Sequence, residues 1–171
     1  MTTTLLEPQI NKDALRHVVE ATAPSPSAEL GVSEKVIDAV ANLRNVFDGQ
    51  LVTTLRTDAQ FLLSVSLPPF DPGAHYPADV LTQIQAAAVE LQSRVQAKTS
   101  GLQELAAGAV HPAVRPLLVT VMDGFRGVFD HAEAIRWAAM NAEAEAELAA
   151  GLGHSFGNVE AALKFLARQR K

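Results

Sequence analysis

The stretch from 123 to 137 holds the side chains best suited to recognising a charged partner. Acidic and basic residues alternate there at the spacing of one helix face, and the only tryptophan of the chain follows them. The residues are Asp123, Arg126, Asp130, Glu133, Arg136 and Trp137. Such charges can pair along a helix without any partner, whereas Trp next to Arg is also typical of interface anchors. We therefore hold two interpretations: a self-paired face with Trp137 in the core, or a recognition surface.

A second candidate is the segment PPFDPGAHYP at 68–77, whose four prolines and one glycine exclude regular structure. Loops of this length on a surface often carry function. The aromatic and imidazole groups of Phe70, His75 and Tyr76 either contact a partner or fold back onto the protein. With Arg126, Asp130, Arg136 and Trp137 they make up our candidate interaction residues.

Metal and catalytic chemistry have weaker support. His17 and Glu20 stand three apart, but a metal site in a helical bundle needs ligands from several helices. The chain has no Cys, no HExxH pattern and no glycine-rich phosphate loop between a strand and a helix. We predict no metal and no cofactor, and lean towards a protein that is not an enzyme.

Bulk composition narrows the classes of partner. A net charge of −5 disfavours nucleic acid, because binding to phosphates needs clustered Lys and Arg. We interpret the basic residues Arg168, Arg170 and Lys171 as a solvated helix end. No apolar run is long enough to span a bilayer, and residues 1–13 do not resemble a secretory signal. These features, with the absence of Cys, lead us to expect a cytoplasmic protein without a membrane segment.

Hydrophobic spacing predicts an all-α fold. Ser33 precedes one helical stripe, Leu81 to Val95 form another, and Val114 to Phe129 form a third. We expect the second of these helices to end near Ser100 and Gly101, with a short helical piece at 102–107. Residues 50–67 either continue the first stripe as helix, through Leu51, Leu55, Asp58, Leu62 and Val65, or form a hairpin. We favour the helix; the hairpin would make the fold α+β.

The last third of the chain predicts two further helices. Asp130 and Glu133 are spaced as a capping pair before a run rich in Ala, Glu and Leu, and Gly151 supplies a stop. A terminal helix follows with Phe156, Val159, Leu163 and Leu166 facing inward. If that helix packs antiparallel, Lys164 comes opposite Glu143 and relieves the acidic run at 143–147.

The resulting expectation is a single-domain bundle of five to seven helices at 28–171. Residues 1–27 precede it as an N-terminal arm with a short helix capped by Asn11 and a Pro/Ser linker. We expect a regulator, adaptor or inhibitor that binds a protein partner or itself through helix faces and the 68–77 loop. The alternative is a small-molecule-binding protein or enzyme with a pocket between helices. Its polar contacts would come from His75, Tyr76, Asp123 and His131.

Overall fold

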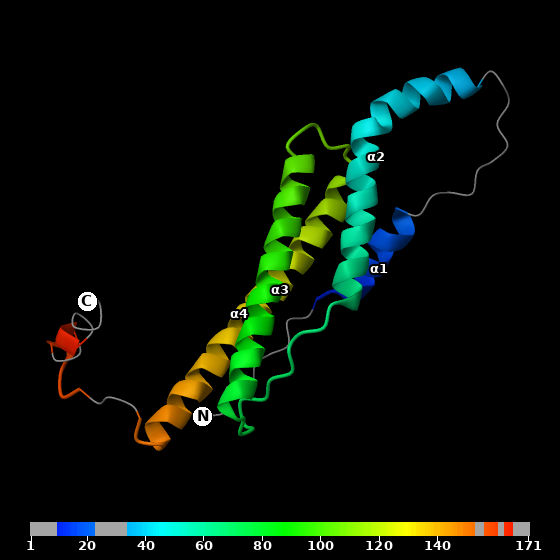
Figure 1. The fold of residues 1–171 in the computed structure, drawn as a ribbon. Coiled ribbons are helices and arrows are strands. Elements are labelled where there is room, and N and C mark those ends of the chain that lie inside the picture. The colour runs from blue at the N-terminus through cyan, green and yellow to red at the C-terminus, as the bar shows by residue number, and fades with distance from the viewer. Residues whose placement is uncertain (1–9, 23–33, 153–155, 161–162, 166–171) are drawn as a thin grey trace.

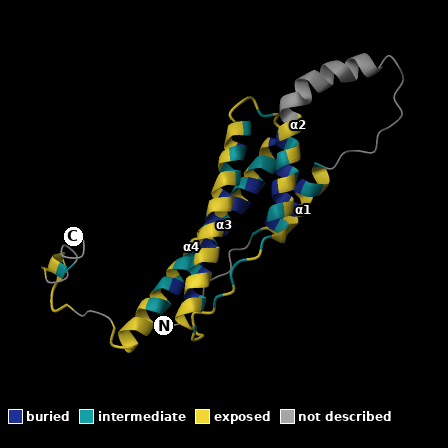
Figure 2. Ribbon diagram, viewed as in Figure 1, coloured by how far each residue is buried: buried dark blue, intermediate teal, exposed yellow. Residues whose placement is uncertain are grey.

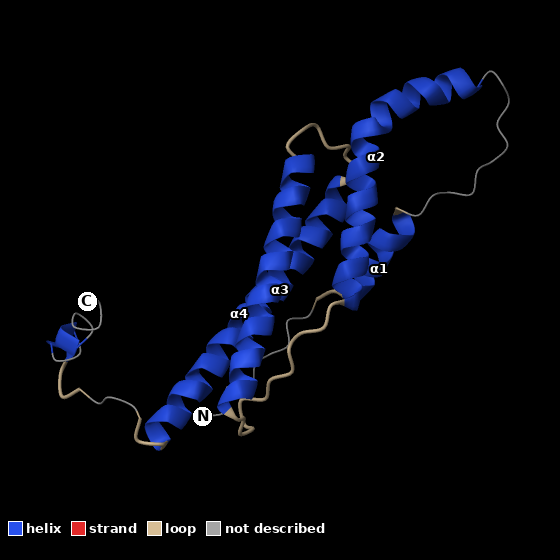
Figure 3. Ribbon diagram, viewed as in Figure 1, coloured by secondary structure: helices blue, strands red, loops and turns tan. Residues whose placement is uncertain are grey.

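The computed structural model describes residues 10–22, 34–152, 156–160 and 163–165, with side chains throughout except at 34–48. This part of the chain contains five helices and no strand (Figure 3). Four of them are α1 (Lys12–Ala21), α2 (Glu34–Ser64), α3 (Ala78–Leu105) and α4 (Arg115–Ala149). The fifth is a short helix that includes residues 159–160 and 163–165. The all-α prediction is confirmed, and the hairpin alternative at 50–67 is wrong because α2 continues to Ser64.

The long hairpin of α3 and α4 forms the frame of the molecule (Figure 1). Two helices cover one half of it: α2 packs against both α3 and α4, and α1 packs against α2 and α4. After α2 ends, the segment 65–77 runs along the other half of the hairpin to the start of α3 (Figure 1). Among the described residues, helices therefore cover one half of the hairpin, and an extended segment covers the other half.

Burial follows the predicted stripes closely (Figure 2). The register predicted for the second half of α2 is confirmed, since Leu51, Leu55, Asp58 and Leu62 are all buried. The predicted inner face of α3 is buried as well, from Leu81 to Val95. One polar side chain of α3, Gln92, is buried together with this face.

Two predicted helix boundaries are wrong. α3 runs through Gly101 to Leu105, because Leu102 is fully buried and its packing keeps the helix going. α4 is continuous where we expected one helix to end and another to begin at Asp130. Its buried residues recur every three or four positions across that point, from Val121 to Ala139, so burial outweighs the local capping signal.

Other terminal signals behave as predicted. The Asn11 side chain accepts a hydrogen bond of 3.0 Å from the backbone N–H of Ala14 and caps α1. Gly151, just past α4, has a φ of +72°, the left-handed conformation in which glycine commonly ends a helix. Leu15 and Val18 of α1 belong to the same buried cluster as α2 and α4. The predicted division of the chain at residue 27 lies outside the described residues.

The inward-facing terminal helix is a further wrong prediction. Phe156, Val159 and Leu163 are all exposed, and Leu166 lies outside the described residues. Lys164 does not reach Glu143: its Nζ lies 2.8 Å from Glu160 Oε1. The Glu143 carboxylate instead accepts a 2.8 Å hydrogen bond from the Gln85 side chain on α3. The unfavourable negative charge at the end of α4 is thus only partly compensated, because the donor is a neutral amide.

Candidate functional site

The outward face of α4 is the strongest candidate for a binding surface. Trp137 is 54% exposed and Leu148 is 60% exposed, although large apolar side chains such as these are costly to leave in water. The two residues are eleven apart, which is three helical turns, so they lie on the same side of α4. Asn141 and Ala144, also exposed, complete this row between them. We call Trp137, Asn141, Ala144 and Leu148 the outer stripe.

The predicted charged face continues the outer stripe towards the start of α4. Arg126 Nε lies 3.8 Å from Asp130 Oδ2, and both side chains are largely exposed. This pair is the self-paired arrangement that the spacing predicted, and a surface pair of this kind contributes little to stability. Arg136 is half-buried on the flank next to the stripe. The α4 candidates Arg126, Asp130 and Trp137 therefore share one side of one helix.

The loop candidates lie elsewhere and contact the protein itself. The rings of Phe70 and Tyr76 stack at 5.4 Å, and the Tyr76 hydroxyl accepts a 2.9 Å hydrogen bond from the Asp71 backbone N–H. Both rings pack on a buried cluster of Leu81, Ile84, Ile135 and Ala139. Ile135 and Ala139 face inward, so the stacked rings and Trp137 lie on different sides of α4. His75 is exposed in the same loop.

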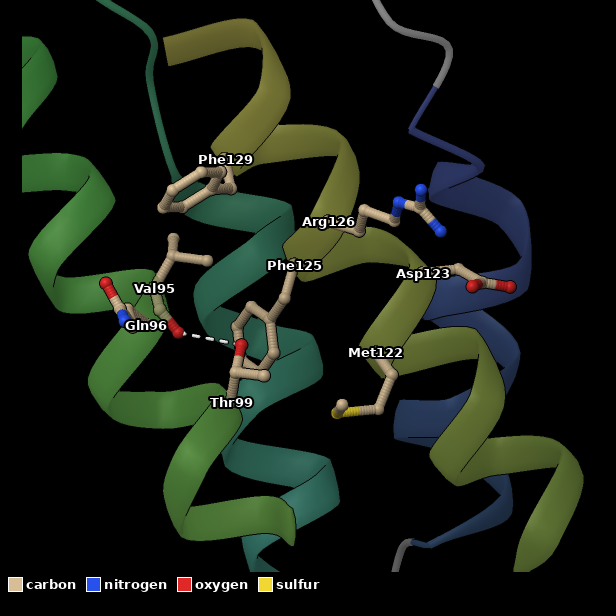
Figure 4. A pocket seen from close by; sticks show the side chains of 8 residues that line it. All are labelled: Val95, Gln96, Thr99, Met122, Asp123, Phe125, Arg126 and Phe129. Atoms are coloured by element: carbon tan, nitrogen blue, oxygen red, sulfur yellow. Dashed lines mark hydrogen bonds between the residues drawn. The ribbon is translucent and has the colours of Figure 1, made fainter. Parts of the chain in front are cut away.

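A groove of about 470 Å³ lies between α3 and α4 (Figure 4). Its walls are mainly apolar, with Val95 on α3 facing Met122, Phe125 and Phe129 on α4. Arg126 and Asp123 stand at its edge and point to the side of α4 away from α3. The Thr99 hydroxyl, which also lines the groove, donates a 2.9 Å hydrogen bond to the Val95 carbonyl. Of the four polar residues expected in a pocket, Asp123 lines this groove, whereas His75, Tyr76 and His131 do not.

One buried ion pair was missed by sequence reasoning. Lys98 Nζ on α3 lies 2.6 Å from Asp58 Oδ1 on α2, and the Asp58 side chain is only 4% exposed. The same ammonium lies 5.0 Å from the centre of the Phe61 ring. The helical stripe predicted over 50–67 puts Asp58 at a core position. A buried carboxylate needs a cation beside it, so this aspartate was the signal that a basic side chain must reach it from another helix. The pair joins α2 to α3 and does not line the groove between α3 and α4.

The described residues contain neither a metal-binding cluster nor a membrane-spanning helix. His17 Nδ1 lies 3.7 Å from Glu20 Oε2, but no third His, Asp or Glu in that part of the chain joins any such pair to make a metal site. None of the helices described combines the length and the apolar character required to cross a bilayer.

Comparison of the chain with known protein families, curated proteins and solved structures found no match.

Proposed function

We propose that this protein is a non-catalytic interaction module that binds a protein partner through the outer stripe of α4. The observation that supports this proposal is the exposure of Trp137 on the same helix face as Leu148. Tryptophan is strongly enriched among the residues that dominate binding energy, and it gains most when water is excluded around it. Next to it, Arg126 and Asp130 supply the charged rim that surrounds such anchors.

The loop residues take a supporting part in this proposal. Phe70 and Tyr76 pack on the half of the α3–α4 hairpin that α1 and α2 do not cover, where they contact the inner side of α4. His75 is exposed in the same loop and is free to contact a partner. Because the two rings cover the inner side of α4, its outer side stays available to a partner. The partner we expect is another protein, with nucleic acid disfavoured by the net charge of −5.

Site-specific photocrosslinking tests this proposal. A photoreactive phenylalanine analogue at position 137 should form covalent adducts with a protein partner in cells, and the same analogue at the exposed α3 position Gln103 should not. Trp137 is the only tryptophan, so its fluorescence reports on this surface alone. The emission of the unsubstituted protein should shift to shorter wavelength when the captured partner is added. Equal adducts at both positions, or none at either, would contradict the proposal.

A second candidate function is supported by the groove between α3 and α4. Its volume of about 470 Å³ and its apolar walls suit a small, mainly apolar ligand. Native mass spectrometry of protein purified from its host tests this alternative. A bound small molecule that is lost from the variant Gln96→Trp, which places a large ring at the exposed wall of the groove, would favour the groove over the outer stripe.

A further inference from the structure

α1 is held against the rest of the molecule by apolar contacts alone. Its buried side chains are Leu15 and Val18, which belong to the cluster formed with α2 and α4 (Figure 1). The polar side chains of α1 pair within the helix itself, as Arg16 does with Asp13. Among the described residues, no hydrogen bond or ion pair joins α1 to α2 or α4. No directional bond is therefore lost when α1 leaves its place.

α1 is also short, so its helical form depends on its docking. It has ten residues, and isolated helices shorter than about 12–15 residues are marginal in water. It buries two residues, whereas α3 and α4 bury seven each. Segments held by few buried groups are those that open locally while the rest of a protein stays folded. We therefore expect α1 to leave its groove more readily than α3 and α4 separate.

The fit of α1 on α4 is incomplete. A hollow of about 210 Å³ remains between the start of α1 and the middle of α4. Ala14 lines the hollow from α1, whereas Gly124 and Gly127 line it from α4 and have no side chains to fill it. A space without partner atoms forgoes the attraction that a closer fit would give. A longer side chain at the position of Ala14 would use this space.

The edge of the hollow carries a negative charge that has no counterpart. Asp123 lines the hollow and lies on the side of α4 that faces away from α3, as Figure 4 shows. Its side chain is exposed and forms no ion pair within the described residues. A long basic side chain suits this place, because its apolar stem can fill the hollow while its charged end meets the carboxylate.

We infer that α1 is a replaceable ligand of its groove and that an amphipathic helix of a partner protein takes its place. The partner helix carries two apolar residues with the spacing of Leu15 and Val18, and a basic residue directly before the first of them. Helices recognise such grooves through apolar anchors at this kind of spacing. Because α1 occupies the groove itself, it lowers the affinity for the partner by the fraction of time that it is docked.

This groove is a different surface from the outer stripe. Gly124 is buried under α1, whereas Trp137, thirteen residues further along α4, is exposed. At 3.6 residues per turn, the two positions point roughly 140° apart around the helix. The inference therefore goes beyond the proposed function, and a failure here leaves crosslinking at position 137 as a separate question.

Fluorescence anisotropy with a labelled peptide of residues 10–22 tests the inference. The full chain with Leu15→Asp should bind this peptide at least tenfold more tightly than the unsubstituted chain, because its own α1 no longer competes. The full chain with His17→Asp is the matched control, since His17 is exposed on α1, and its affinity should stay within twofold of the unsubstituted chain. A peptide that itself carries Leu15→Asp should not bind.

Peptide variants at Ala14 test the hollow and its charge. With the Leu15→Asp chain as receptor, the Ala14→Arg peptide should bind at least fivefold more tightly than the natural sequence. It should also bind at least threefold more tightly than Ala14→Gln, which has a similar stem without charge. Adding Asp123→Asn to the receptor should remove the difference between Arg and Gln. If the Arg peptide binds no better than the natural one, the assignment of a basic residue to the hollow is wrong.

Amide hydrogen exchange of the unsubstituted protein gives a second measurement. Residues 12–21 should exchange faster than residues 121–128, which lie in the core beneath α1. Equal protection of the two stretches, or loss of protection throughout the Leu15→Asp chain, would show that α1 is a fixed part of the core and would overturn the inference. So would a peptide that binds the Leu15→Asp chain no more tightly. A dimer that Leu15→Asp abolishes would make a second copy the occupant and contradict the partner helix.

Discussion

At the scale of single residues, Asp58 and Trp137 are placed against the usual preference of charged groups for the surface and of large apolar groups for the interior. Asp58 is a charged group inside, and Trp137 is a large apolar group outside. For Asp58 the cost is offset by Lys98 at 2.6 Å, so its placement has a structural explanation. For Trp137 no burial within the described structure offsets the cost, which is why we assign it to an interface. Of these two residues, only Trp137 therefore enters our proposal for the function.

Lys98→Met should lower the free energy of unfolding by about 2–3 kcal/mol, because the buried Asp58 carboxylate then lacks its cation. Urea unfolding followed by circular dichroism measures the loss. Arg94→Met is the matched control, since Arg94 also lies over Phe61, at 5.2 Å, but is exposed and pairs with no buried acid. It should cost at most about 1 kcal/mol. Adding Asp58→Asn to Lys98→Met should recover stability; equal losses in the two single variants would show that Asp58 tolerates isolation.

At the scale of helices, the contact between α2 and α4 depends on a glycine. A Cβ atom at Gly124 would lie 2.7 Å from Leu62 Cδ1, closer than such atoms approach. Leu62 is itself buried in the core and has little room to move. Three residues further along α4, a Cβ at Gly127 would lie 3.8 Å from Ile10, an ordinary contact. The two glycines of the same helix thus have different roles, and only Gly124 allows close packing.

Gly124→Ala and Gly127→Ala should change stability in opposite directions. Alanine at Gly127 should raise the free energy of unfolding by about 0.5–1 kcal/mol through helix propensity alone. Alanine at Gly124 gains the same propensity but overpacks the contact with Leu62, a cost of about 1–3 kcal/mol, so we expect a net loss of about 1 kcal/mol. Thermal and urea unfolding of both variants measure the difference. A stabilised Gly124→Ala protein would mean that α2 and α4 are not in such close contact.

At the scale of the whole molecule, the α3–α4 hairpin has two unequal cores. One half holds the large cluster shared with α1 and α2. The other half holds four buried residues, Leu81, Ile84, Ile135 and Ala139, covered by Phe70 and Tyr76 from the segment 65–77. Because fewer buried contacts hold this second half, it should open locally more often than the first. The outer stripe lies on that half, where a partner would add the most order.

Phe70→Ala should speed amide hydrogen exchange at 78–90 and 133–149 while leaving 115–130 unchanged, because the lost contact belongs to the smaller core. Mass spectrometry of exchanged peptides measures this. Val121→Ala, which removes buried volume from the larger core, is the comparison and should speed exchange in both halves. If Phe70→Ala instead affects both halves equally, the hairpin opens as one unit and the two cores are not separate.

The spacing of apolar residues determined most of the secondary structure by itself. The continuation of α2 past Gly49 and the inner face of α3 could be predicted because a buried helix side requires apolar residues every three or four positions. The caps at Asn11 and Gly151 could be predicted for the same kind of local reason. These features depend on residues near one another in the sequence.

Where a local sequence signal competes with contacts to residues far away in the chain, only the tertiary structure decided the outcome. Asp130 and Gly101 have the residue types of helix ends, yet burial of Ile135 and Leu102 against other helices keeps α4 and α3 continuous. The same holds for the aromatic candidates: Phe70 and Tyr76 find a cluster to cover, and Trp137, on the opposite side of α4, does not. Whether a side chain is covered depends on which other element reaches it, and that information is spread over the whole chain rather than held in any one segment.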